Sequence, residues 1–191
     1  MSVYENYLEV EKKVQEACKR AGRNREEVTL IAVSKTKPVS MIEELLPHGV
    51  VDFGENKVQE LTAKYEVLPK DLNWHLIGHL QSNKIKKIVG QVDMIQSVDS
   101  FETAQQISRR SGEQGITTDI LLEVNIGEDE NKFGYSADEV ADQLGKIAEL
   151  QFVKVKGMMT VAPNFKDSAK NQCVFDNMHK LFIDIGAKKM D

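Results

Sequence analysis

Apolar residues at the start of the chain recur in steps of three and four, which places them on one face of a helix. Charged residues fill most of the opposite face, and Gly22 marks the expected end of this helix. The apolar positions are Val3, Tyr7, Val10, Val14, Ala17 and Ala21. The pattern is too short for a coiled coil, so we expect a helix that packs on a larger body.

Beyond this helix, the pattern alternates between short apolar runs and longer amphipathic stretches. Short runs rich in β-branched residues are typical of buried strands, and amphipathic stretches are typical of helices. The pattern therefore predicts six strand–helix units without an internal linker. The predicted strands are residues 28–33, 50–53, 73–77, 92–97, 119–124 and 152–158.

Local signals predict several helix ends. Ser40 with Glu43 has the spacing of a capping box, and so has Ser136 with Glu139. We therefore expect these two serines to cap the helices that follow them. Gly186 is the expected end of the last helix.

Repeated strand–helix units predict a parallel sheet with right-handed crossovers. Two architectures meet this condition, a doubly wound open sheet and a closed (β/α)8 barrel of the TIM type. Barrels need roughly 200–250 residues, and two further units of the same length would bring the chain into that range. The chain thus resembles about six of the eight βα units of a barrel, plus an N-terminal helix. Six units also complete an open sheet, so the count leaves both architectures open.

The composition is that of a globular protein. The chain has 191 residues and a formal net charge of −5, a balance that argues against nucleic acid as a partner. We see no apolar run near the ~18 residues of a membrane span, and no secretory signal pattern at the first residues. Cys18 and Cys173 lack metal-ligand spacing and are expected to be buried thiols. We expect one cytoplasmic domain that does not bind membranes.

Polar residues and glycines gather directly after the predicted strands, where ligands bind in both architectures. Lys35 is the strongest candidate, because burial at a strand end favours the uncharged, nucleophilic amine. Lys37 would share a strand face with Lys35 by parity. The alternative is a lysine whose ammonium group reaches solvent.

Two histidines have a spacing that can serve a metal on a helix. His75 and His79 are four residues apart, but they belong to a predicted strand, where four residues span about 13 Å. We therefore expect no metal site and place His75 in the core or in a pocket. The nucleotide-binding glycine motifs and the nucleophile elbow were not found in the sequence.

Five motifs along the chain together resemble a known family. The lysine motif AVSKTKP occupies residues 32–38, and others follow in order over essentially the whole chain. These are FGEN at 53–56, WHLIG at 74–78 with LQSNK at 80–84, NKFG at 131–134 and GMM at 157–159. Any one alone would be weak, but the series resembles the pyridoxal phosphate (PLP) homeostasis proteins, which are similar to the N-terminal domain of alanine racemase.

The resemblance implies an alanine-racemase-like (β/α)8 barrel, the third fold type of PLP proteins, with PLP as cofactor. It implies that Lys35 holds PLP as a Schiff base, that Asn56 lies beside the ring, and that His79 and Met158 line the pocket. It assigns no catalytic residue and no metal. Family members continue past the last helix with a segment that holds the phosphate. We therefore expect residues 1–191 to form a single PLP-binding domain that is C-terminally incomplete.

Three functions stay open at this point. The resemblance implies a PLP-binding protein of intracellular PLP homeostasis, without turnover of its own and with PLP-dependent enzymes as clients. The second is a PLP-dependent amino-acid racemase, a reaction that needs proton transfer on both faces of the substrate. The third, independent of the resemblance, is a binding protein for an anionic metabolite. We see no exposed apolar stripe beyond the core faces and expect a monomer.

Overall fold

Six parallel strands form one sheet in the computed structural model, which describes residues 2–127, 132–163 and 168–189. Each strand pairs with its neighbours in sequence, so the order runs from β1 to β6 without reversal. A doubly wound sheet reverses at a switch point, whereas a barrel does not. The order therefore confirms the barrel type. The strands are β1 (Ala32–Val33), β2 (Asp52–Glu55), β3 (Asn73–Leu76), β4 (Met94–Val98), β5 (Thr118–Glu123) and β6 (Val153–Met159).

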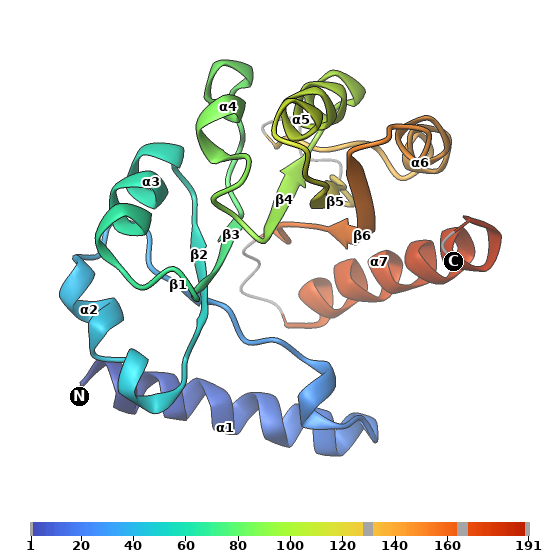
Figure 1. Ribbon diagram of the computed structural model, residues 1–191. Helices are drawn as coiled ribbons and strands as arrows, with labels where there is room; N and C mark the ends of the chain where they lie inside the picture. The colour runs from blue at the N-terminus through green and yellow to red at the C-terminus, as the bar shows by residue number, and fades with distance from the viewer. Residues whose placement is uncertain (1, 128–131, 164–167, 190–191) are drawn as a thin grey trace.

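Helices surround the sheet on its outer side (Figure 1). Helices α2 to α6 follow one another around the strands, α1 lies below β1 and β2, and α7 lies beside β6. Among the described residues, no helix is long and apolar enough to cross a membrane. The α-helices are α1 (Val3–Ala21), α2 (Val39–Glu43), α3 (Val58–Val67), α4 (Ile85–Ile88), α5 (Phe101–Glu113), α6 (Val140–Ile147) and α7 (Ser168–Lys189). Three 3₁₀ turns are η1 (Arg25–Glu27), η2 (Leu46–His48) and η3 (Ser82–Lys84).

The main core lies between the sheet and the outer helices. Phe53 and Trp74 are fully buried on adjacent strands, with ring centroids 5.8 Å apart. Glu55 shares the sheet face of Phe53 because strand residues alternate, and its contact with Lys64 of α3 identifies that face as the helix side. The opposite face, which carries His75, is the inner side of the barrel.

The first strand is shorter than the sequence predicts. The apolar run at 28–33 suggests a buried strand of six residues, but β1 contains only Ala32 and Val33. The strand pairs with β2 alone and is the outer strand of the described sheet, where Val33 is 49% exposed. An apolar run needs a partner on both sides to become a buried strand, and this one has a partner on one side.

Of four predicted helix ends, two are wrong, one is confirmed, and one is found in its hydrogen bonds but not in its position. Ser40 is not a cap, because α2 already begins at Val39 after Pro38. The last helix continues through Gly186 to Lys189. Gly22 ends α1 in a left-handed conformation, with φ of 65°. Ser136 and Glu139 make the reciprocal hydrogen bonds of a capping box, although a turn separates Ser136 from the first residue of α6.

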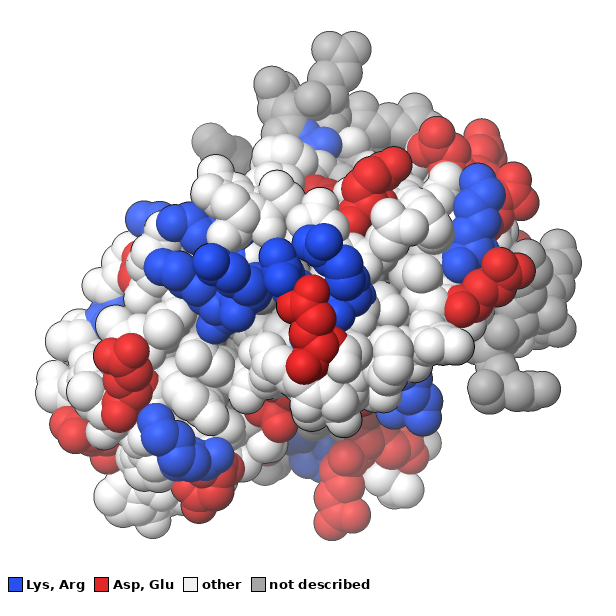
Figure 2. All heavy atoms as spheres, turned by 45° about the horizontal axis from the view of Figure 1, so that its top comes forward, with Lys and Arg blue, Asp and Glu red and all other residues white. Residues whose placement is uncertain are grey.

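The surface carries a basic patch and an exposed thiol group. Lysine and arginine side chains gather on the face that α4 and α5 present to solvent (Figure 2). Lys86 and Lys87 of α4 and Arg110 of α5 lie in the last turns of these helices. This basic patch lies on the outer helix layer.

Cys18 is buried as expected, but Cys173 is exposed on α7, so the expectation of two buried thiols is wrong for Cys173.

Candidate functional site

The carboxyl ends of parallel strands meet at one edge of the sheet, and the loops after them form the mouth of the barrel. Lys35 follows β1, Asn56 follows β2 and His79 follows β3. Because β1 pairs with β2 and β2 with β3, these three residues come from neighbouring strand ends. Three of the four predicted site residues therefore follow strands whose ends meet at the mouth.

Lys35 lies in a tight turn directly after β1. The Ser34 N–H donates to the Gly54 carbonyl at 3.0 Å, which continues the β1–β2 ladder by one residue. The Lys37 N–H then donates to the Ser34 carbonyl at 3.0 Å and closes the turn. The Lys35 side chain is exposed, so the expected burial of this lysine is not found. The prediction that Lys35 and Lys37 share one face of a strand is also wrong. Both residues lie beyond the end of β1, Lys35 in the turn and Lys37 directly after it.

Two residues beside Lys35 are held by buried or partly buried groups. The Ser34 hydroxyl donates to Glu55 Oε1 at 2.7 Å, and Lys64 Nζ donates to the Ser34 carbonyl at 2.7 Å. Lys64 also forms an ion pair with Glu55 at 2.5 Å, and both side chains are buried. On the other side, the Thr36 N–H donates to Glu60 Oε2 at 2.6 Å. This bond lowers the pKa of Glu60 below its ordinary value of 4.5.

A cavity of about 250 Å³ lies at the mouth between β2, β3 and β5. Asn56 and His79 both line it, together with Glu123 and Phe133. The buried Asn56 Oδ1 has no hydrogen-bond partner in the described part of the chain. An unpaired buried amide oxygen beside a cavity is suited to accept a hydrogen bond from a ligand.

The strand ends that form this cavity approach each other closely at one glycine. A Cβ atom built on Gly78 would lie 2.5 Å from the Asn56 carbonyl oxygen and 2.7 Å from its Cα. A residue with a side chain would therefore push the end of β3 away from Asn56. Gly78 thus sets the width of the cavity, and the sequence singled it out only as part of a motif.

His79 is fixed by one polar and one aromatic contact. Its Nδ1 lies 2.9 Å from Asp99 Oδ2, at the end of β4. Its ring stacks on Phe133, with centroids 3.8 Å apart and an angle of 12° between the planes. These two contacts orient the imidazole at the rim of the mouth.

Two buried acidic groups near this rim have shifted pKa values. Burial raises the pKa of Glu123, the negative charge of Asp99 raises it further, and His79 offsets part of the rise. Burial, followed by Asp99 and Glu102, raises the pKa of the Tyr135 hydroxyl. The mouth thus holds a carboxyl group that favours its neutral form more than a free glutamate does.

His75 lies deeper, on the inner face of the sheet. Its Nε2 is 3.4 Å from Asp52 Oδ1, and its Nδ1 is 3.1 Å from Gln96 Nε2. The histidine is buried, which confirms its predicted place in the interior. Within the described ranges, no three metal-ligating side chains come together, and neither His75 nor His79 belongs to such a group.

The structure brings together only part of the predicted site. Asn56 and His79 share the cavity, whereas Lys35 and Met158 do not line it. Met158 is half-buried in β6, opposite Leu122 of β5. The sequence reasoning missed Lys64. A lysine on an amphipathic helix is usually solvated, and the only available signal was the acidic Glu55 inside an apolar strand.

The donor set at the mouth fits PLP. The ring needs a narrow cavity with polar contacts, which the unpaired Asn56 Oδ1 and the oriented His79 ring supply. The aldehyde needs a primary amine within the same mouth, and Lys35 at the end of β1 is such an amine.

Comparisons with known proteins give the class. Residues 9–185 match the family "alanine racemase, N-terminal domain". An alanine racemase from Clostridium difficile superposes with a TM-score of 0.69 at 16% identity, over 85% of this chain and 44% of that one. At this identity the likeness shows the fold alone. The class is thus the alanine-racemase-like barrel.

Within that class, the relatives are more specific. A "pyridoxal phosphate homeostasis protein" from Aquifex aeolicus is 37% identical over 182 residues, 95% of this chain and 80% of the relative. The one from Pasteurella multocida is 32% identical over 185 residues, 95% of this chain and 79% of the relative. PipY of Synechococcus elongatus, solved with PLP bound, has a TM-score of 0.78 at 33% identity, over 92% of this chain and 82% of that one. The chain belongs to the family of pyridoxal phosphate homeostasis proteins, which confirms the resemblance drawn from its motifs.

Proposed function

We propose that this protein binds PLP in intracellular PLP homeostasis and holds it on Lys35. The observation that carries the proposal is the position of Lys35 in a fixed turn at the carboxyl end of β1, in a chain 33% identical to a relative solved with PLP bound. Lys35 follows β1 and Asn56 follows β2, and these two strands pair with each other. In this proposal, the Lys35 amine at the mouth binds the aldehyde of PLP. The Asn56 amide, which is unpaired beside the cavity, contacts the ring.

Each site residue has a separate role in this proposal. The Lys35 amine, in its uncharged form, would hold the aldehyde of PLP as a Schiff base. Asn56 and His79 contact the ring in the cavity, and Met158 of β6 contributes to the pocket wall. Bound PLP supplies an electrophilic imine carbon and an electron-withdrawing ring. The proposal assigns no catalytic residue and no metal.

We further propose that residues 1–191 act as a single PLP-binding barrel domain without turnover. The names of the relatives refer to homeostasis and not to a reaction, which supports this reading. In a homeostasis role, the partners are PLP itself and PLP-dependent client enzymes, and neither nucleic acid nor membrane takes part. The cytoplasm is the proposed location, and a monomer the proposed state.

Absorbance between 300 and 450 nm during a PLP titration tests the binding. We expect a new band that Lys35→Ala removes and Lys37→Ala retains. Borohydride reduction followed by peptide mass spectrometry should place the added mass on Lys35. A label mainly on Lys37, or spread evenly over surface lysines, would overturn the assignment. A racemisation assay covers the alternative, because turnover near the ~10 s⁻¹ enzyme median would make the protein a racemase.

A further inference from the structure

One helix holds the turn that carries Lys35 from both sides. Lys64 donates to the carbonyl of Ser34, the residue before Lys35, at 2.7 Å. Glu60 accepts the N–H of Thr36, the residue after Lys35, at 2.6 Å. Both side chains come from α3, so the backbone on each side of Lys35 is fixed to the same rigid element.

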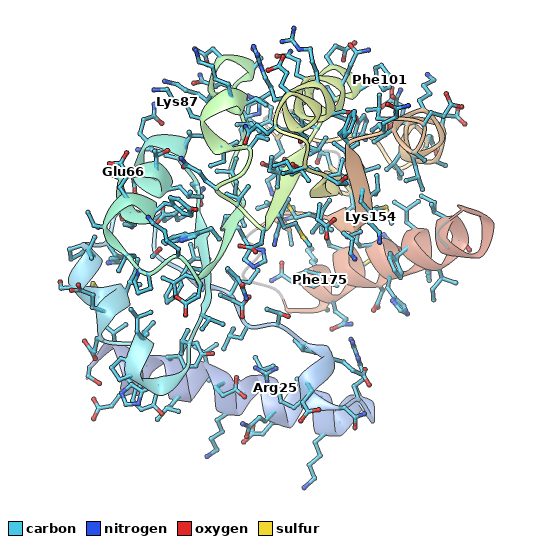
Figure 3. The ribbon with its side chains drawn as sticks, in the orientation of Figure 1. Arg25, Glu66, Lys87, Phe101, Lys154 and Phe175 are labelled. Carbon is cyan, nitrogen blue, oxygen red and sulfur yellow. The ribbon has the colours of Figure 1, made fainter. Side chains whose placement is uncertain are left out.

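The sequence spacing explains how one helix reaches both sides. Glu60 and Lys64 are four residues apart, one turn of α3, and therefore lie on the same face. Glu66 lies on the outer side of the same helix (Figure 3) and contacts none of the described side chains through a hydrogen bond or ion pair. Glu60 and Lys64 thus differ from Glu66 in the face of α3 on which they lie.

The turn requires such a clamp because its backbone is unusual. Thr36 has φ of 61°, in the left-handed region that a β-branched residue rarely adopts. The Thr36 N–H donates to the Glu60 carboxylate in this conformation, so the bond stabilises a backbone geometry that threonine by itself disfavours.

The buried side of the clamp is equally specific. Lys64 Nζ contacts both the Ser34 carbonyl and Glu55 Oε1, and Glu55 in turn accepts the Ser34 hydroxyl at 2.7 Å. The hydroxyl and the carbonyl of Ser34 are therefore both bonded to this pair. The Lys35 side chain has no such contact with a described residue and stays exposed. The network fixes the backbone of Lys35 and leaves its amine available.

We propose that Glu60 and Lys64 are positioning residues that aim the Lys35 amine into the mouth of the barrel. The inference rests on the proposed function, since it assumes that Lys35 is the amine that bonds to PLP. Neither residue touches the cofactor in this proposal. They act by holding the Ser34 carbonyl and the Thr36 N–H.

Glu60 is the better residue to vary, because it is near the surface and its loss leaves no buried charge. Glu60→Ala removes the acceptor for the Thr36 N–H, whereas Glu60→Gln keeps an amide oxygen in its place. Glu66→Gln is the matched control on the outer side of α3. We expect the apparent PLP affinity of Glu60→Ala to fall by about one to two orders of magnitude, the most that one charge-assisted hydrogen bond contributes, and that of Glu60→Gln to fall much less.

Two readouts separate positioning from loss of structure. The ratio of borohydride-trapped label on Lys35 to that on Lys37 should fall in Glu60→Ala and stay unchanged in Glu66→Gln. Hydrogen exchange of the Thr36 amide, measured without PLP, should be faster in Glu60→Ala alone. If Glu60→Ala also melts lower, titrations well below its melting temperature still compare it with Glu60→Gln.

The outcomes are distinct. Wild-type protein that gives no label on Lys35 contradicts the proposed function itself. Suppose that wild-type protein carries the label on Lys35, and that Glu60→Ala has the wild-type affinity and the wild-type Lys35-to-Lys37 ratio. This result overturns the positioning role and leaves the proposed function intact. A fall in both, rescued in Glu60→Gln, supports positioning.

Discussion

Glu55 of β2 and Lys64 of α3 form a buried ion pair, with Oε1 and Nζ 2.5 Å apart and almost no exposure of either side chain. The pair joins the sheet to a helix at the point where β1 ends, because both partners also bond to Ser34. A charge buried in this way is stable only while its partner is present. The ion pair thus couples the packing of α3 to the turn that carries Lys35.

Lys64→Met should lower the free energy of unfolding by about 3–5 kcal/mol, because it leaves the Glu55 carboxylate buried and unpaired. The double variant Glu55→Gln with Lys64→Met removes both charges and should be clearly more stable than Lys64→Met alone. Urea unfolding of the two variants measures the difference. Equal stabilities would show that the carboxylate of Glu55 carries no charge penalty.

Gly78→Ala should both destabilise the protein and weaken PLP binding. The added methyl group would meet backbone atoms of Asn56 at 2.5–2.7 Å, and backbone yields less easily than side chains. Forced overpacking costs about 1–3 kcal/mol. Chemical denaturation measures the cost, and a PLP titration measures the change at the mouth.

Gly22→Ala is the control for this variant. Gly22 has φ of 65° and open space around the missing Cβ, so alanine there costs only the left-handed conformation, about 1–2 kcal/mol. It lies at the end of α1, away from the strand ends that form the mouth, and should leave PLP binding unchanged. Weaker PLP binding in both variants would contradict a local role for Gly78.

Thr36→Asn should raise the melting temperature. Asparagine tolerates the left-handed conformation that Thr36 adopts at φ of 61°, and a β-branched residue does not. The substitution keeps the N–H that Glu60 accepts. We expect a gain of about 1 kcal/mol. A lower melting temperature would show that the threonine side chain itself supports the turn.

The sequence predicted the larger features of the fold because they repeat. Six apolar runs separated by amphipathic stretches produce six parallel strands in barrel order. The motifs with Lys35 and Asn56 indicated the family, and the strand-end rule placed both residues at the mouth. These predictions depend only on local sequence patterns and require no knowledge of tertiary contacts.

Other features depend on tertiary contacts that no local pattern records. The run at 28–33 has the composition of a buried strand, but only two of its residues find a partner. Lys64 resembles any lysine on a helix until α3 packs against Glu55. Lys35 was expected to be buried, yet its side chain is exposed in the turn that follows β1. In each case, the partner comes from another element, so periodicity alone could not identify it.

Glu123→Gln should stabilise the protein in a pH-dependent way. Burial raises the pKa of Glu123 above 4.5, so between 4.5 and the raised value the folded state binds more protons than the unfolded state. Stability then falls as pH rises through that window, because the carboxylate must ionise at a buried site. Below pH 4.5 the cost is absent, and above the raised pKa it is complete.

Glutamine is neutral at every pH and avoids this cost. The gain in melting temperature of Glu123→Gln over wild type should therefore be smallest near pH 4, grow as pH rises and then level off. Carboxyl groups distant from Glu123 are the same in both proteins, so their contributions largely cancel in the difference. Glu66→Gln, at an exposed position on α3, controls for the loss of one carboxylate. A gain that is the same at every pH, or a loss that deepens as pH rises, would show that Glu123 is stabilised as its anion.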